Sequence, residues 1–212
     1  GVARADGPDL LCCPDRMPRR RLLIRLCALL LLTACGEGSR ESTCPALGGG
    51  GGYCLQATSA PGPFAVRQKV EASLRGRQAT LIAAIENDAD GLRVVGLTPF
   101  GQKLLQISYD NRQVSAATLP DSRLDPTLLV ALLQITLWPA DAVRAGLTSP
   151  LTLEDDGAQR RVLNAGQVIL SIRFSTDEAP WRRMHLSEHA LALELEIETL
   201  PEELNEGLEP QR

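Results

Sequence analysis

The sequence has few aromatic residues, and its charge is net negative. Phe, Trp and Tyr make up 3% of the 212 residues, and 26 Asp and Glu outnumber 22 Lys and Arg to give a formal charge of −4. Nucleic-acid-binding proteins usually combine a basic surface with aromatic side chains on which bases stack. The composition therefore argues against nucleic-acid binding, while an apolar fraction of 44% is ordinary for a globular domain.

The motifs of nucleophilic and phosphate chemistry are absent or incomplete. No Gly-x-Ser-x-Gly occurs in the chain. Gly96 and Gly101 have the spacing of a phosphate-binding loop, but Gln102-Lys103 follows them instead of Lys-Ser or Lys-Thr. A turn between two strands explains both glycines. We expect no catalytic residue, no cofactor and no enzymatic activity.

The chain has two histidines, and their spacing is the one feature that suggests a metal. His185 and His189 are four residues apart, as in a zinc-binding helix, with Glu188 between them. The glutamate is misplaced for His-Glu-x-x-His, the neighbouring residues fit a strand or turn, and no third ligand is evident. We expect solvent-exposed histidines and no metal site.

No apolar run is long enough to cross a membrane, but a short one lies near the N-terminus. Residues 26–33 are mainly leucine and follow a basic stretch that includes Arg19, Arg20, Arg21 and Arg25. A hydrocarbon core of about 30 Å needs a longer helix, whereas this arrangement is typical of a signal peptide. The run ends in Leu32-Thr33-Ala34-Cys35, which resembles the lipobox of bacterial lipoproteins. An ordinary signal peptide or a buried apolar helix is the alternative interpretation.

The lipobox resemblance implies cleavage before Cys35 and attachment of a diacylglycerol to its thiol. Residues 1–34 are then upstream sequence and signal peptide, and Met17 is the expected true start, with residues 1–16 absent from the natural protein. Their removal takes away more arginine than aspartate, so the mature chain is more acidic. The residue after the cysteine is Gly36 rather than aspartate. In this family that implies sorting to the outer membrane, on the periplasmic side.

After maturation two cysteines remain as thiols, Cys44 and Cys54. A pair of cysteines in an oxidising periplasm favours a disulfide, because a metal site would need two further ligands nearby. Residues 36–52 are rich in Gly, Ser and Glu and include a glycine run at 48–52. Such a composition cannot bury a core. We therefore predict a lipidated Cys35 with a flexible tether through residue 52, followed by one domain over residues 53–212 with an acidic C-terminal tail.

The pattern from residue 53 onward is mostly that of strands. Apolar and polar residues alternate in five segments, which indicates strands with one buried face. Turn sequences at 88–91 and 110–111 separate some of them. Together they predict an antiparallel sheet with one apolar face. The segments are 80–86, 92–97, 102–109, 168–174 and 191–198.

One segment has helical spacing instead. Asp125 can cap a helix with Pro126 in its first turn, and leucines follow at helical intervals up to Leu137. Trp138-Pro139 interrupts this helix, and residues 140–145 add a turn or two. An apolar helix within a series of strands fits across the concave face of a curved sheet. The expected fold is mainly β with helices: a curved antiparallel sheet, or half-open β-barrel, with a helical plug.

These segments also carry a family resemblance. The motif Gly-Leu-Thr-Pro-Phe-Gly at 96–101, the strand at 102–110 and Leu137-Trp138-Pro139 resemble a family of uncharacterised proteobacterial outer-membrane lipoproteins. Its members often sit near aryl-polyene and fatty-acid-like biosynthesis genes. That family in turn resembles LolA and LolB, which carry lipoproteins through the periplasm and insert them into the outer membrane. The resemblance covers roughly residues 53–200.

The resemblance implies a protein that binds or hands over an acyl chain, in a lipid, a lipoprotein or a polyene lipid, with a LolA-like carrier as a possible partner. Each buried methylene contributes about 0.8 kcal/mol, so one long chain can supply a useful affinity. The alternatives are that the candidate residues pack against each other as a core, and that the protein is an envelope scaffold or accessory subunit acting through its surface. The candidate lining residues are Leu105, Ile107, Leu129, Leu133, Leu137, Trp138, Leu193 and Leu195.

Overall fold

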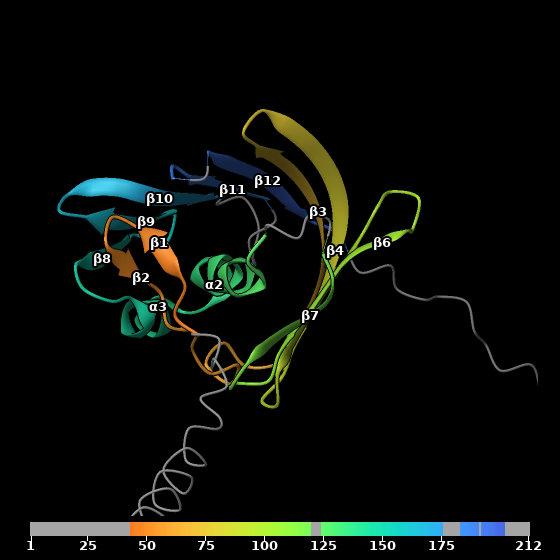
Figure 1. The fold of residues 1–212 in the computed structure, drawn as a ribbon, viewed down its shortest axis with the longest axis horizontal. Coiled ribbons are helices and arrows are strands. Elements are labelled where there is room, and N and C mark those ends of the chain that lie inside the picture. Colours follow the sequence, from red (N-terminus) through yellow and green to blue (C-terminus); the bar gives the residue numbers. More distant parts are fainter. Residues whose placement is uncertain (1–42, 120–123, 176–182, 191, 202–212) are drawn as a thin grey trace, which may run out of the picture. The chain divides into compact units, whose positions relative to one another are not determined.

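A sheet of ten antiparallel strands dominates the part of the chain that the computed structural model describes, residues 43–119, 124–175, 183–190 and 192–201 (Figure 1). These residues belong to one compact unit. None of the described helices is long and apolar enough to span a membrane. The strands are β3 Phe64–Leu74, β4 Arg77–Asn87, β5 Leu92–Leu97, β6 Lys103–Tyr109, β7 Val114–Thr118, β8 Leu151–Asp155, β9 Gln159–Asn164, β10 Gln167–Phe174, β11 Arg183–Glu188 and β12 Leu193–Thr199.

The strand order joins two meanders in one sheet. It runs β7-β6-β5-β4-β3-β12-β11-β10-β9-β8, and each neighbouring pair is antiparallel. Of the ten strands of this sheet, β3 comes first along the chain and β12 last, and these two pair at its middle. The edges are β7 and β8, which are consecutive in sequence. The sheet therefore stays open, and the chain must cross from one edge to the other between these two strands.

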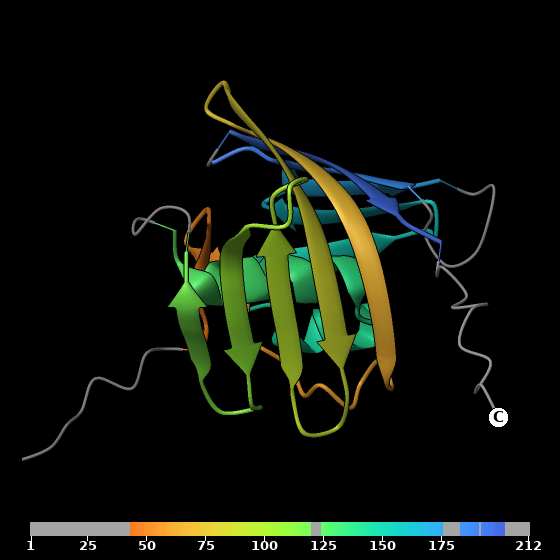
Figure 2. The ribbon, with the colours of Figure 1, turned by 90° about the vertical axis from the view of Figure 1, so that its right-hand side faces the viewer.

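Two helices make that crossing. Helix α2 spans Pro126–Leu137 and helix α3 spans Ala140–Gly146. Helix α2 lies on the concave side of the sheet, behind strands β3 to β7 in the view of Figure 2. The expected curved antiparallel sheet with a helix across its concave face is confirmed.

The local signals that predict α2 operate as expected. The Asp125 side chain accepts a hydrogen bond from the backbone N–H of Thr127 at 2.8 Å, and Pro126 occupies the first turn, where its missing N–H costs nothing. Trp138 is extended, with φ −76° and ψ 153°, and ends the helix before Pro139. Eight of the twelve residues of α2 are buried, and Pro126, Leu128, Leu129 and Leu133 are half-buried.

The five alternating segments all fall in strands, and their apolar faces point to the concave side. Register places Ile85 opposite Val94 and Val94 opposite Ile107, and all three are buried. Directly opposed residues share one side of a sheet, so these pairs define its inner face. The prediction starts its last strand at Leu191, which lies outside the described residues; β12 begins at Leu193.

The structure corrects the predicted tether for its second half. Strands β1 Ala46–Gly48 and β2 Gly51–Gly52 form a small hairpin, and Leu47 within it is 4% exposed. A Cβ atom on Gly51 would lie 2.4 Å from Cγ of Leu151, so this glycine permits close packing. The glycine run, predicted to be flexible, instead shapes this hairpin: Gly48, Gly49 and Gly50 have positive φ around its turn, and Gly51 permits the close packing. Residues 36–42 of the predicted tether lie outside the described part.

Candidate functional site

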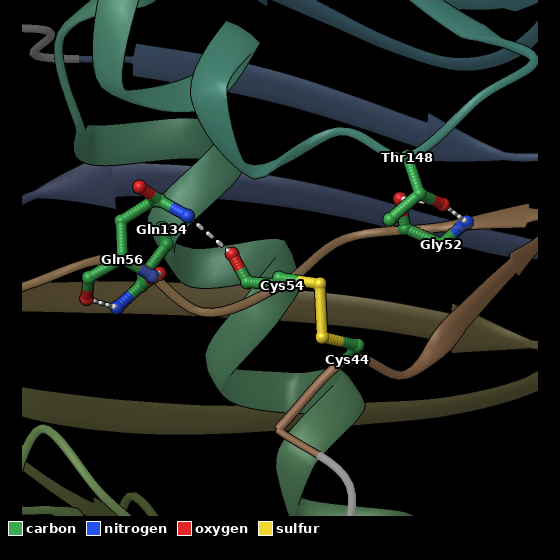
Figure 3. The surroundings of a disulfide bond; sticks show 6 residues. All are labelled: Cys44, Gly52, Cys54, Gln56, Gln134 and Thr148. Carbon is green, nitrogen blue, oxygen red and sulfur yellow. Dashed lines mark hydrogen bonds between the residues drawn. A yellow bond between two sulfur atoms is a disulfide. The ribbon is translucent and has the colours of Figure 1, made fainter.

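A segment at residues 53–58, called here the strap, binds helix α2 to the rest of the domain. The backbone N–H of Gln56 donates to Oε1 of Gln134 at 2.8 Å, and Nε2 of Gln134 donates back to the Gln56 carbonyl at 2.9 Å. Figure 3 shows Gln134 approaching the strap from α2. Nε1 of Trp138 donates to the carbonyl of Ala57 at 3.1 Å. Gln134 and Trp138 are fully buried, so these bonds fix the helix position from within the core.

The strap is in turn tied to the hairpin by a disulfide. Cys44 and Cys54, the pair expected from the sequence, are bonded to each other (Figure 3). The backbone N–H of Cys54 also donates to the carbonyl of Gly146 at 2.7 Å, at the end of α3. The disulfide thus joins the two ends of the hairpin segment, and the backbone bond of Cys54 holds the start of the strap against the end of α3.

Replacing both cysteines by serine should lower the free energy of unfolding by about 3 kcal/mol, because a closed loop of roughly ten residues removes that much entropy from the unfolded chain. Urea unfolding of the oxidised protein and of Cys44→Ser/Cys54→Ser measures the difference. A reducing agent should destabilise the original protein to the same degree and leave the variant unchanged. Equal stability of oxidised protein and variant would contradict the expectation.

A buried ion pair secures the same C-terminal end of α2 from another side, and sequence reasoning missed it. Nε of Arg160 donates to Oδ2 of Asp155 at 2.6 Å, and both side chains are less than 10% exposed. Nη1 of Arg160 donates to the carbonyls of Ile135 at 2.6 Å and Trp138 at 2.9 Å. A cation there satisfies carbonyls left unpaired at the C-terminus of the helix and opposes its dipole.

The same cluster shifts the acidity of Asp155. Burial alone would raise its pKa, but hydrogen bonds from the backbone N–H of Gly157 and from Arg160, together with the arginine charge, lower the pKa overall. The carboxylate is therefore charged in the folded protein. The alternating pattern gave no sign of this pair, because an arginine that points inward interrupts the apolar face of β9.

The structure separates the eight candidate lining residues into two groups. Four are core residues, with exposures of 2% for Ile107, 5% for Leu137, 0% for Trp138 and 8% for Leu193. The other four are half-buried and pack against the edge of that core: Leu105, Leu129, Leu133 and Leu195. The two groups correspond to the two interpretations left open by the sequence, packed core and accessible lining.

Five half-buried aliphatic residues lie on the inner face of the sheet, in strands β12, β3, β4 and β6, and are called here the apolar band. Register places Val70 opposite both Leu81 and Ile197, and Leu195 lies opposite Ala72. A Cβ atom on Gly96 would lie 3.0 Å from Cβ of Leu105 and 3.6 Å from Cδ1 of Leu81, so these two leucines adjoin across β5. The band consists of Val70, Leu74, Leu81, Leu105 and Leu195.

Two cavities in the described part measure about 200 Å³ each, and neither is lined by any of the eight candidate residues. Pockets for small molecules usually measure about 300–1,000 Å³. Both cavities are therefore smaller than a usual small-molecule pocket. One cavity is lined by Lys69, Glu71, Arg183, Glu196, Ile197 and Glu198, and the other by Ala46, Leu47, Gly48, Leu128, Glu188 and Ala190.

The two histidines occupy different structural positions. Nε2 of His185 in β11 lies 3.1 Å from Oε2 of Glu194 and 3.5 Å from Oε1 of Glu196, and its side chain is 27% exposed rather than fully solvated. His189 lies in the exposed turn that follows β11. No cluster of three or more metal-ligating side chains exists among the described residues.

Gly96 and Gly101 also separate structurally. Gly96 lies within β5, and Gly101 has a φ of 80° in the turn before β6. Gly96 thus belongs to a strand and Gly101 to the turn that follows it, which is consistent with a strand–turn–strand segment.

The fold and its inner face define a class: an open antiparallel sheet that curves around one apolar helix. The chain belongs to the family described as "Protein of unknown function (DUF3261)", whose model matches residues 65–201, the span from β3 to the end of β12. No curated protein matches the sequence. The matched span contains the whole apolar band and helix α2, so the candidate site lies within the family's common region.

Proposed function

We propose that the protein is a lipid-anchored outer-membrane lipoprotein that binds an acyl chain on the inner face of its sheet and hands it over. The observation that carries the proposal is the apolar band, a row of half-buried aliphatic side chains on the concave face of the sheet. The signal-like N-terminus, the lipobox at Cys35 and Gly36 after it support a periplasm-facing position at the outer membrane.

Burial of an acyl chain against the apolar band would give a useful affinity. Burial of ten methylenes would contribute roughly 8 kcal/mol, which corresponds to a micromolar Kd before the costs of ordering the chain. Leu129 and Leu133 lie one turn apart on α2 and extend the accessible apolar surface on the concave side. The acyl chain can belong to a lipid, a lipoprotein or a polyene lipid, because methylenes alone are recognised. A LolA-like carrier is the partner that this proposal implies, and binding requires no catalysis.

The proposal predicts that Leu105→Gln weakens acyl binding and that Leu104→Gln does not. Both leucines are half-buried in β6, but they point to opposite faces of the sheet. An amide placed in the band loses its water on binding, which costs about 1–3 kcal/mol and should raise the Kd by roughly 5- to 150-fold. The measurement is fluorescence titration of the mature chain carrying Cys35→Ser with cis-parinaric acid, followed by displacement with palmitate and phosphatidylethanolamine.

The paired variants make this test specific. Equal urea midpoints for Leu104→Gln and Leu105→Gln would show that any difference in binding is local to the inner face. Equal weakening by both variants, or no saturable binding by the protein with unaltered leucines, would refute the acyl-binding proposal.

The second candidate function is an envelope scaffold or accessory subunit with a filled core. The full burial of Ile107, Leu137, Trp138 and Leu193 favours it, since these side chains already occupy one another's space. Hydrogen exchange separates the two functions. A carrier should change protection in α2 when palmitate is added, whereas a scaffold should show the same protection with and without palmitate.

A further inference from the structure

The two ends of the sheet carry opposite charge. In an antiparallel meander alternate turns lie at opposite ends, so the turns after β3, β5, β9 and β11 share one end. Arg75, Arg77 and Lys103 are exposed there, and none of them forms an ion pair within the described ranges. This end is called here the basic end.

The acidic side chains nearest the basic end are engaged elsewhere. Glu188 is 4% exposed and accepts a hydrogen bond from the backbone N–H of Ala190. Glu194 points outward and binds both Ser187 and His185. Neither carboxylate offsets the three cations at the turns.

The opposite end is acidic. Its turns follow β4, β6 and β8 and carry four exposed aspartates together with one arginine, Arg112. Three of the aspartates, Asp88, Asp110 and Asp156, accept backbone hydrogen bonds that shape these turns. The segregation therefore places positive charge at one end of an otherwise acidic protein. The four aspartates are Asp88, Asp90, Asp110 and Asp156.

The basic end also carries the most exposed aromatic side chain of the described residues. Phe100 is 93% exposed, at the tip of the turn between β5 and β6, which projects from the sheet beside β6 in Figure 1. The turn is fixed by two hydrogen bonds: the backbone N–H of Gly101 donates to the Thr98 carbonyl at 2.9 Å, and the N–H of Gln102 donates to Oγ1 of Thr98 at 3.0 Å. The fixed turn thus holds a large apolar side chain outward at the same end of the sheet as the three cations.

The apolar band reaches this same end. Leu74 is the last residue of β3 and directly precedes Arg75, and Leu105 follows Lys103 by two positions in β6. Leu74 and Leu105 both belong to the inner face. A ligand that enters or leaves the band at the basic end would therefore pass between the cations and Phe100.

We infer that the basic end docks on the surface of an anionic phospholipid bilayer. Phe100 enters the headgroup region, and Arg75, Arg77 and Lys103 lie against lipid phosphates. Charge complementarity selects this partner, because a basic end on an acidic protein is drawn to an anionic surface while the aspartates of the other end are repelled. The inference rests on the proposed function and adds the direction in which the acyl chain moves, between the bilayer and the band.

The test is sedimentation of the mature chain carrying Cys35→Ser, so that no lipid anchor masks the contact. Vesicles of phosphatidylethanolamine with phosphatidylglycerol are compared with vesicles of phosphatidylcholine alone. Each cation near an anionic surface contributes roughly fivefold to partitioning, so Arg75→Gln/Arg77→Gln/Lys103→Gln should lose binding to the anionic vesicles on the order of a hundredfold. Arg112→Gln, which removes a cation from the acidic end, is the matched control. It should bind the anionic vesicles as tightly as the protein without these substitutions.

The aromatic contribution is tested separately. Phe100→Ser should weaken vesicle binding by roughly tenfold, as expected for a lost aromatic contact with the interface. Phe100→Trp should bind fully, and its emission should shift to the blue when anionic vesicles are added. Absence of vesicle binding, or equal binding by Phe100→Ser and the triple variant, would overturn the inference. A photo-cross-linking residue placed at position 100 should react with lipid. Its cross-linking to an envelope protein instead of to lipid would also overturn the inference.

The docking inference and the acyl-binding proposal fail in different ways. Phe100→Ser should bind cis-parinaric acid normally, since Phe100 lies outside the band. If Phe100→Ser loses vesicle binding but still binds cis-parinaric acid, docking is a property separate from acyl binding. If the protein binds the probe but no vesicle, docking alone is wrong; if it binds vesicles but no probe, acyl binding alone is wrong.

Discussion

Replacing Arg160 by methionine should lower the free energy of unfolding by about 3–5 kcal/mol, the cost of leaving a buried charge without its partner. Methionine keeps much of the side-chain volume but removes the donors to Asp155 and to the carbonyls of Ile135 and Trp138. These groups are buried, so the loss of their hydrogen bonds should cost far more than the loss of a surface pair. Urea unfolding followed by circular dichroism measures it.

The adjacent residue supplies the control. Arg161 forms an ion pair with Glu154 at 2.7 Å between the same two strands, but the side chains are 41% and 54% exposed. Arg161→Met should cost at most about 1 kcal/mol, as is usual for exposed pairs. Similar losses for the two substitutions would show that burial of the Arg160 pair does not matter to stability.

The pH dependence of this cluster has a definite sign. The pKa of Asp155 is lowered in the folded protein, so its contribution to stability is complete above the unfolded pKa of about 3.9 and is lost as the pH falls through the lower, folded pKa. In Arg160→Met a major cause of the lowering is gone, while burial of the carboxyl remains. The difference in stability between the two proteins should therefore narrow in acid below about pH 4.

The elements that the sequence predicted well are those whose local signals agree with their surroundings. Helix α2 has its cap at Asp125 and its end at Trp138-Pro139, and β12 has an uninterrupted alternation of Leu and Glu. In such segments each residue's neighbours in sequence also determine its environment. The open, curved sheet with a helix across it followed from these pieces, because an apolar helix between strands needs an apolar face to cover.

Strands with a polar residue on their inner face were not predicted from the alternation of apolar and polar residues. In β3 the inner face carries Gln68, which is 5% exposed, and in β9 it carries Arg160. Both side chains find partners on distant segments, Thr199 for the glutamine and α2 for the arginine. Long-range partners of this kind leave no trace in local periodicity.

The role of the glycine run and the segregation of charge could not be predicted from the sequence for a related reason. Residues 48–52 look flexible until Leu151 is brought against Gly51 by the fold. The basic end exists only because the strand order brings turns from distant parts of the chain to the same side. Composition gives the net charge, but topology decides where that charge lies.

Replacing Trp138 by alanine should be the most disruptive change in the apolar core, at about 3–5 kcal/mol. The indole is fully buried and packs edge-on against Phe64, with ring centroids 6.2 Å apart and planes at 85°. Its Nε1 donor also holds the strap at Ala57. Trp138→Phe keeps the aromatic contact but loses the hydrogen bond and some volume, so we expect about 1–3 kcal/mol for that change. Urea unfolding of both variants gives the two values.

The same pair of variants decides whether Trp138 belongs to the core or lines the acyl site. If it is core, Trp138→Phe should bind cis-parinaric acid as tightly as the unaltered residue does, because the probe never reaches a side chain with no exposure. Altered probe affinity in Trp138→Phe, at an unfolding loss no greater than expected, would instead place the indole in the binding surface. Helix α2 would then have to move away from the sheet when the ligand binds. The indole of Trp138 is bonded to the strap, and the carbonyl of Trp138 is bonded to Arg160. Movement of α2 would have to break both hydrogen bonds. These bonds therefore favour an acyl chain that lies along the open band while α2 stays in place.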